Sequence, residues 1–224
     1  MKVLSAAEMQ SCDRVTTERF GVPSLDLMRA AASAVATIAR GYFKDARRVT
    51  VLCGKGNNGG DGMMAARLLA DVGLEVTVLL LGSPDDLKGD AAVAWRELKS
   101  MGRAVVEVVN SAEDLSKHDA ARSADLIVDA VVGTGFKPPL KGLGLAALEW
   151  AKASLAPILS VDLPSGWPSD ETSATIDDPV FPSDAVVTFT APKPAPPVPP
   201  SLTGLFTTSK GRTRADPSTP LIVE

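Results

Sequence analysis

The sequence has 224 residues, of which 45% are hydrophobic and 22% charged, so it can form one full-sized globular domain with a sizeable core. Its formal net charge of −4 argues against nucleic acid as the main partner, because a phosphate backbone requires a basic face. No apolar run approaches the ~20 residues of a membrane span. The two cysteines lack metal-site spacing and favour a reducing, cytoplasmic setting.

The apolar pattern predicts two N-terminal helices followed by alternating strands and helices. Helices are expected over residues 5–20, 24–42, 62–72, 88–101, 112–121 and 143–154. Strands are expected over residues 49–53, 74–81, 104–109, 126–133, 157–163 and 185–191. Their continuous β-branched runs are typical of strands that helices cover on both faces. We therefore predict an α/β fold, a three-layer αβα, Rossmann-like arrangement around a mostly parallel sheet.

The composition changes after the last expected strand. Six prolines lie between residues 192 and 200, and a polar run follows them. Such a segment cannot hold a regular helix and has little apolar surface to bury. We expect one domain over residues 1–195, followed by a Pro-rich polar tail over 196–224 that is partly disordered.

The segment GKGNNGGDG, residues 54–62, occupies the corner between the first expected strand and its helix. Its glycines match a dinucleotide-binding pattern, in which N–H groups at a helix start bind phosphate. The next strand, however, ends in LLLGSP and offers no acidic residue for a ribose hydroxyl, which disfavours an NAD-dependent oxidoreductase. No Lys-Ser/Thr pair follows the last glycine, so this is not a Walker A loop. The structural alternative is a turn in which Gly and Asn adopt left-handed dihedrals.

Two further expected strands carry an aspartate at or near their carboxyl ends. Asp129 precedes the loop GTGFKPP, and Asp162 precedes the loop PSGW. A carboxylate at a buried strand end needs hydrogen bonds or a cation to offset its desolvation. Because ligands bind beyond the carboxyl ends of parallel strands, three such loops indicate one site. The alternative is that each aspartate only caps a turn.

In this order, the segments GKGNNGGDG, VDAVVGTGFKPP, SVDLPSGW and TFTAPKP resemble those of the YjeF N-terminal domain family, the NAD(P)HX epimerases. The resemblance covers about residues 1–195. It implies a Rossmann-like homodimer that binds potassium and epimerises the R and S forms of NADHX and NADPHX, a cofactor-repair step. Bacterial members are often fused to an ADP- or ATP-dependent dehydratase. We expect this chain to lack that domain, which makes a separate dehydratase a candidate partner.

The resemblance also assigns roles to single residues. Asp162 corresponds to the acidic residue at the hydrated ring, and is the expected catalytic acid–base group. Lys193 corresponds to a lysine near the site and is a second catalytic candidate, although a surface charge is an equal alternative. The implied potassium ligands are Asn58, Asp129 and Ser165, whose oxygens suit a hard cation. Besides Asp162, the implied substrate-binding residues are Asn57, Asn58, Gly59, Gly60, Asp61, Gly133, Thr134, Gly135, Phe136, Lys137, Pro138 and Pro139.

Three features qualify this interpretation. Arg29 stands where relatives tend to carry a glutamate. The only histidine, His118, lies in a polar helical stretch and is expected at the surface. Some proteins with this domain act as non-catalytic scaffolds that bind nucleotide ligands or proteins, which is the alternative function. Such a scaffold would tolerate the loss of Asp162, and because the chain retains this residue we favour the enzyme.

Overall fold

The computed structural model of the chain describes residues 3–170, 177–191 and 204–208. Its centre is a seven-stranded parallel sheet with the strand order β3-β2-β1-β4-β5-β6-β7. The strands are β1 (Arg48–Cys53), β2 (Glu75–Leu81), β3 (Val105–Val109), β4 (Leu126–Ala130), β5 (Ile158–Val161), β6 (Ala185–Phe189) and β7 (Gly204–Thr208). The helices are α1 (Ala6–Phe20), α2 (Ser24–Tyr42), α3 (Asn57–Asp71), α4 (Gly89–Met101), α5 (Ala112–Ser116) and α6 (Gly142–Lys152).

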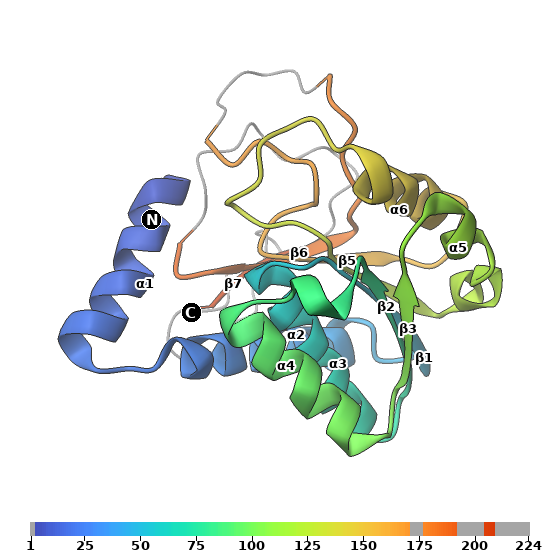
Figure 1. The fold of residues 1–224 in the computed structure, drawn as a ribbon, viewed down its shortest axis with the longest axis horizontal. Helices are drawn as coiled ribbons and strands as arrows, with labels where there is room; N and C mark the ends of the chain where they lie inside the picture. The colour runs from blue at the N-terminus through green and yellow to red at the C-terminus, as the bar shows by residue number, and fades with distance from the viewer. Residues whose placement is uncertain (1–2, 171–176, 192–203, 209–224) are drawn as a thin grey trace.

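Helices cover both faces of the sheet (Figure 1). Helices α2, α3 and α4 pack on one face, where Val35, Met63 and Leu98 are buried with alternate residues of the strands. Helices α5 and α6 pack on the other face, where Leu148 meets Leu52 of β1. The strands are therefore buried on both sides, and the predicted three-layer αβα fold with two N-terminal helices is confirmed.

Helix α3 begins at Asn57, five residues before the expected start near residue 62. The glycine-rich segment is thus mostly helical, and none of its residues has a positive φ, so the left-handed turn considered above is wrong. The glycines are needed for close approach instead. A Cβ on Gly59 would lie 1.8 Å from the carbonyl oxygen of Gly54, and one on Gly62 would lie 2.4 Å from Cβ of Ala130.

Two strands are shorter than their apolar patterns suggested. β4 ends at Ala130, although the expected strand continued to residue 133, and β5 ends at Val161, although the expected strand continued to residue 163. Beyond these points the chain leaves the sheet and hydrogen-bonds to other loops. The expected helix over 112–121 is also divided, into α5 and a 3₁₀ turn over Asp119–Ser123.

Strand β7 pairs in parallel with β6 and lies inside the range expected to be a polar tail. Residues 192–203 and 209–224 lie outside the described residues, so the boundary at 195 and the disorder beyond it stay predictions. Within the described ranges, no helix has both the length and the apolar character needed to cross a membrane.

Candidate functional site

Three loops meet at the carboxyl edge of the sheet, where its strand order reverses. β1 and β4 are neighbours at the centre of the sheet. From β1 the chain order continues to one side with β2 and β3, and from β4 it continues to the other side with β5, β6 and β7. The start of α3 follows β1, the 131–140 segment follows β4, and the 162–170 segment follows β5. In open α/β sheets such a reversal leaves a crevice that binds ligands. The predicted convergence of the three loops is observed.

Asp129 is the buried centre of this edge. Its side chain is fully inaccessible to solvent, and it accepts four hydrogen bonds. The donors are the Ser165 hydroxyl at 2.5 Å, the Ser165 N–H at 2.8 Å, the Ser160 hydroxyl at 2.8 Å and the Val131 N–H at 3.2 Å. Burial raises the pKa of the Asp129 carboxyl, and the hydrogen bonds oppose that rise.

The other two predicted potassium ligands, Asn58 and Ser165, are also linked to each other through Val132. The Asn58 side-chain amide donates to the Val132 carbonyl at 2.9 Å, and the Val132 N–H donates to the Ser165 hydroxyl oxygen at 2.9 Å. The structure thus gathers carboxylate, hydroxyl, carboxamide and main-chain oxygens, the donor types that hard cations prefer. No group of three His, Cys, Asp or Glu side chains that could hold a metal ion occurs among the described residues.

Ser160 belongs to the site although sequence reasoning did not select it. It is the register partner of Asp129 across β4 and β5, it donates to that carboxylate, and it also hydrogen-bonds to Ser183. The available signal was a serine inside the otherwise apolar strand Ile158–Val161. A polar residue in a buried strand requires a partner, and the register here supplies it.

Asp162 adopts a backbone conformation that is uncommon for residues other than glycine. Its φ is +67°, in the left-handed region that non-glycine residues seldom occupy. Its N–H donates to the Val187 carbonyl at 2.7 Å, and Thr188 donates its hydroxyl to the Asp162 carboxylate at 3.4 Å. The side chain is partly exposed at the site edge. Strained residues of this kind cluster at functional sites, because the surrounding structure holds them in place.

Asp61, on the second turn of α3, lies in the electrostatic field of three other carboxylates. Burial raises its pKa well above the usual range, and the charges of Asp162, Asp13 and Asp90 raise it further. The sequence placed Asp61 and Asp162 in separate loops. In the folded chain the charges of Asp162 and of Asp13, on α1, both act on Asp61.

The remaining residues that were predicted to bind substrate differ in their exposure to solvent. Asn57, Gly135, Lys137 and Pro139 are exposed, Gly133, Thr134 and Pro138 are partly buried, and Gly59 and Gly60 are buried beneath the helix start. The side chain of Phe136 packs against the core beneath α6, which favours a structural role. The Ser169 hydroxyl donates to the Thr134 carbonyl at 3.2 Å and joins the second and third loops. Lys193 lies outside the described residues.

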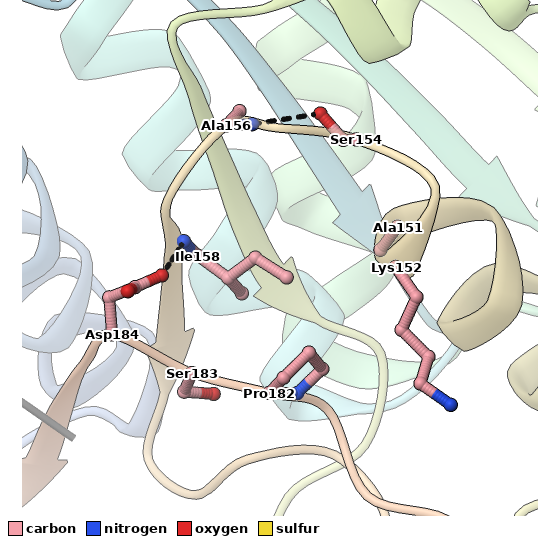
Figure 2. A pocket seen from close by; sticks show the side chains of 8 residues that line it. All are labelled: Ala151, Lys152, Ser154, Ala156, Ile158, Pro182, Ser183 and Asp184. Atoms are coloured by element: carbon pink, nitrogen blue, oxygen red, sulfur yellow. Dashed lines mark hydrogen bonds between the residues drawn. The ribbon is translucent and has the colours of Figure 1, made fainter. Parts of the chain in front are cut away.

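A separate pocket of about 400 Å³ lies at the opposite, amino-terminal edge of β5 and β6. Figure 2 shows it between the end of α6 and the segments that precede the two strands. Two of its polar side chains already serve the local fold: Asp184 accepts from the Ile158 N–H at 2.8 Å, and Ser154 accepts from the Ala156 N–H at 3.1 Å. Its lining residue Ser183 is also the hydrogen-bond partner of Ser160 and so contacts the Asp129 network from below, and we assign no ligand to the pocket.

Comparison with known proteins gives consistent matches. The family model described as "YjeF-related protein N-terminus" matches residues 24–195. An NAD(P)H-hydrate epimerase of Rhodobacter capsulatus is 35% identical over 201 residues, which cover 87% of this chain and 91% of the relative. An NAD(P)H-hydrate epimerase of Rhodopirellula baltica is 35% identical over 192 residues, which cover 85% and 75% of the two chains.

Longer relatives and one solved structure extend this comparison. A bifunctional NAD(P)H-hydrate repair enzyme of Moorella thermoacetica is 36% identical over 196 residues, which cover 86% of this chain but only 37% of the relative. The chain therefore spans little more than a third of that enzyme's length. The crystal structure of the yeast protein ynu0 superposes with a TM-score of 0.74 at 27% identity, covering 87% and 82% of the two chains.

Proposed function

Because this chain belongs to the family of YjeF-related protein N-termini, we propose that it epimerises the R and S forms of hydrated nicotinamide cofactors, NADHX and NADPHX. The reaction is an isomerisation that repairs damaged cofactor. The observation that carries the proposal is the position of Asp162, a partly exposed carboxylate in strained backbone at the edge where the three loops meet. Residues held in such backbone cluster at functional sites, and this carboxylate is open to a ligand.

The start of α3 provides the binding site for the cofactor phosphates. Gly56 caps this helix without a side-chain hydrogen bond, so no capping side chain uses the N–H groups of the first turn. Such N–H groups and the helix dipole favour an anion. Asn57 is exposed at this helix start, and Gly135, Lys137 and Pro139 of the second loop are exposed as well, so we assign them to the other side of the ligand.

Asp162 acts as the acid–base group in this mechanism. The hydrate carries a hydroxyl on ring carbon six, next to the ring nitrogen, so inversion requires the C–O bond to open and to close on the other face. A carboxyl group can give a proton to the leaving oxygen and take one from the returning oxygen. The reaction needs no redox change. Thr188 and the Val187 carbonyl hold Asp162 in position for both steps.

We propose that potassium binds beside Asp129, at the buried part of the site. Asn58, Asp129 and Ser165 would hold the ion, with the Val132 carbonyl beside them. When bound, it supplies positive charge that offsets the burial of the Asp129 carboxylate. Hydrogen bonds from Ser165 to Asp129 and from the Val132 N–H to Ser165 join the second and third loops directly.

The test is incubation of the purified protein with R-NADHX, with chromatographic detection of the S epimer. Formation of S-NADHX at a rate proportional to protein concentration supports the proposal. Binding of the hydrate without conversion contradicts it and supports the alternative, a non-catalytic nucleotide-ligand-binding or protein-interaction scaffold. A catalytically inactive Asp162 variant should be run beside the wild type to exclude a contaminating epimerase.

The proposed partners follow from the same family. We propose a homodimer, and a separate ADP- or ATP-dependent dehydratase that consumes the S epimer formed here. The longer bifunctional relatives support this pairing, because their names assign two activities to one chain. Light scattering would show the mass of the assembly, and a mass equal to a single chain at micromolar concentration contradicts the dimer.

A further inference from the structure

The N-terminal helix α1 packs at the edge of the site instead of on the helix layers. The Ala6 N–H donates to the Asp170 carboxylate at 2.8 Å, and Asp170 lies on the loop that follows β5. Leu4 and Met9 are buried together with Ala191, just beyond the end of β6. Figure 1 shows α1 standing beside the main body, apart from α2 and α3. These contacts attach the helix to the same edge of the sheet that carries the site.

One face of α1 is directed toward the site loops. Gln10 and Asp13 are three residues apart and so lie on neighbouring positions of one face. The charge of Asp13 acts on Asp61, which also interacts with Asp162. The amide nitrogen of Gln10 lies 4.0 Å from the position that a Cβ on Gly135 would take.

The carboxamide of Gln10 is exposed, and it hydrogen-bonds to no other residue in the described part of the chain. The helix that carries it is fixed at its start by a capping box, in which Ser5 and Glu8 exchange hydrogen bonds. An unpaired amide is therefore carried on an anchored helix, beside Gly135 of the second loop and one turn from Asp13.

We propose that Gln10 is a specificity-determining residue that recognises the carboxamide of the nicotinamide ring. The proposal rests on the proposed function, which places the ring at Asp162. A glutamine side chain offers both N–H donors and a carbonyl acceptor, so it can form two complementary hydrogen bonds with another carboxamide. A ring that carries a carboxylate instead has no donor for the Gln10 oxygen. Gln10 thus selects amide-bearing dinucleotides over their acid analogues.

A binding experiment tests this selection without turnover. Calorimetric titrations compare NAD⁺ with nicotinic acid adenine dinucleotide on the wild type, on Gln10→Ala and on the control Glu18→Ala. Glu18 is exposed on the same helix and lies two turns from Gln10. Because Gln10→Ala removes the hydrogen bonds that only the amide can match, the preference for the amide should fall about tenfold in this variant. It should be unchanged in Glu18→Ala.

The quantity compared among the proteins is the ratio of the affinities for NAD⁺ and for its acid analogue. Asp13, Asp61 and Asp162 repel an acidic ring in all three proteins, so their effect cancels in this comparison. An equal preference in wild type and Gln10→Ala overturns the proposal, as does the absence of any preference in the wild type. Equal melting temperatures would show that the exposed substitution leaves the fold intact.

Kinetics separates this proposal from the proposed function. With R-NADHX as substrate, Gln10→Ala should raise KM about tenfold and change kcat less than about threefold, because the bond positions the ring in ground and transition states alike. An active wild type whose KM is unchanged by Gln10→Ala contradicts the role of Gln10 alone. A wild type that prefers the amide but forms no S epimer contradicts the epimerase function and leaves the recognition by Gln10 supported.

Discussion

Two aspartates at neighbouring strand ends have different environments and, we propose, different roles. Asp129 is fully buried and accepts four hydrogen bonds, so its carboxylate is fixed between the second and third loops. Asp162 is partly exposed and sits in left-handed backbone. A proton can be exchanged with a ligand only at a carboxylate that the ligand can reach. The geometry therefore favours Asp162 as the acid–base group and Asp129 as the organiser of the site.

We predict that Asp162→Asn abolishes epimerisation and preserves the fold. Asparagine tolerates the left-handed conformation at least as well as aspartate, so the backbone at φ +67° is kept. It cannot exchange a proton, and loss of general acid–base help costs ~10²–10⁴-fold in rate. An epimerisation assay is run beside a thermal melt, with the exposed Asp45→Asn as control. Near-normal turnover with a lowered melting temperature would show that Asp162 is structural.

Asp61 allows a prediction about stability and pH. Burial and the charges of Asp162, Asp13 and Asp90 raise its pKa, so the folded state binds this proton more tightly than the unfolded state. The free energy of unfolding is then highest below the ordinary aspartate pKa, and it falls as pH rises through the raised value. Asp61→Asn removes this penalty and should melt at a higher temperature than the wild type at pH 8.

The gain should shrink as the pH falls and disappear well below about pH 4, where the carboxyl group is protonated in both the folded and the unfolded wild type. Thermal melts at several pH values measure the difference, and Asp45→Asn, an exposed aspartate, serves as the control. A variant less stable than the wild type at pH 8 would mean that the Asp61 carboxylate makes a favourable contact in the folded protein.

Among the helices and strands, the close packing of α3 against the sheet matters most for the geometry of the site. The glycines at its start allow the helix to approach the ends of β1 and β4, and this places Asn58 within hydrogen-bond distance of Val132. The same approach leaves the helix N-terminus facing the crevice. The motif therefore serves packing and binding together, because the helix can present its N–H groups at the sheet edge only if it lies close to the strands.

Gly62→Ala tests this packing. The added Cβ would lie 2.4 Å from Cβ of Ala130 and 3.2 Å from the Cys53 sulfur, so the helix must shift, and overpacking of this kind costs ~1–3 kcal/mol. The matched change Gly41→Ala, in α2 with no neighbour within 4 Å, should stabilise the protein by up to about 1 kcal/mol. Urea unfolding measures both. Equal effects of the two substitutions would refute the close-approach argument.

A second element-scale feature joins the helices that cover one face. Glu97 on α4 accepts from Arg29 of α2 at 2.9 Å and from Arg67 of α3 at 2.9 Å. Arg29, for which the sequence predicted no role, thus forms ion pairs with Glu97 and with Asp26 of its own helix. The network connects three helices that otherwise meet through apolar contacts.

We predict that Glu97→Gln destabilises the protein by about 1 kcal/mol, because the partly buried Arg67 loses its charged partner. Glu149→Gln removes only the exposed pair with Lys152 and should cost less than about 0.5 kcal/mol. Chemical denaturation at low and high salt measures both changes. If Glu149→Gln costs as much as Glu97→Gln, then the network does not join the helices.

At the scale of the whole molecule, potassium should stabilise the fold, because its proposed ligands come from three segments far apart in the sequence. At saturating concentration a ligand of this kind adds ~1–3 kcal/mol to the free energy of unfolding. Thermal melts should therefore show a higher melting temperature in potassium chloride than in choline chloride at equal ionic strength. Ser165→Ala should remove this difference between the salts.

Ser169→Ala provides the control, because Ser169 is a buried serine of the same loop that bonds to the Thr134 carbonyl and is outside the proposed ligand set. It should keep the salt difference whatever its own effect on stability. A potassium effect that survives in Ser165→Ala would place the ion elsewhere or make it nonspecific.

Much of the architecture could be predicted from local pattern alone. The alternation of strands and helices, the burial of the strands on both faces and the three loops at strand ends all follow from short-range periodicity and composition. Helix α3 was expected to begin too late, because its glycines and asparagines have low helix propensity and the helix start is decided by packing against Ala130 and Gly54. The ends of β4 and β5 were misjudged for a related reason, since apolar residues continue where the chain already turns into the site.

The layers of the fold, the loops that form the site and the family resemblance follow from the sequence, because they depend on residues close together in the chain. Which side chains meet depends on the folded arrangement instead. Ser160 and Ser165 reach Asp129 across separations of 31 and 36 residues, and Asp13 acts on Asp61 from a separate helix. Such meetings depend on strand order, register and helix placement. Hydrophobic periodicity specifies which face of an element is buried, but it does not specify which residue of another element lies opposite.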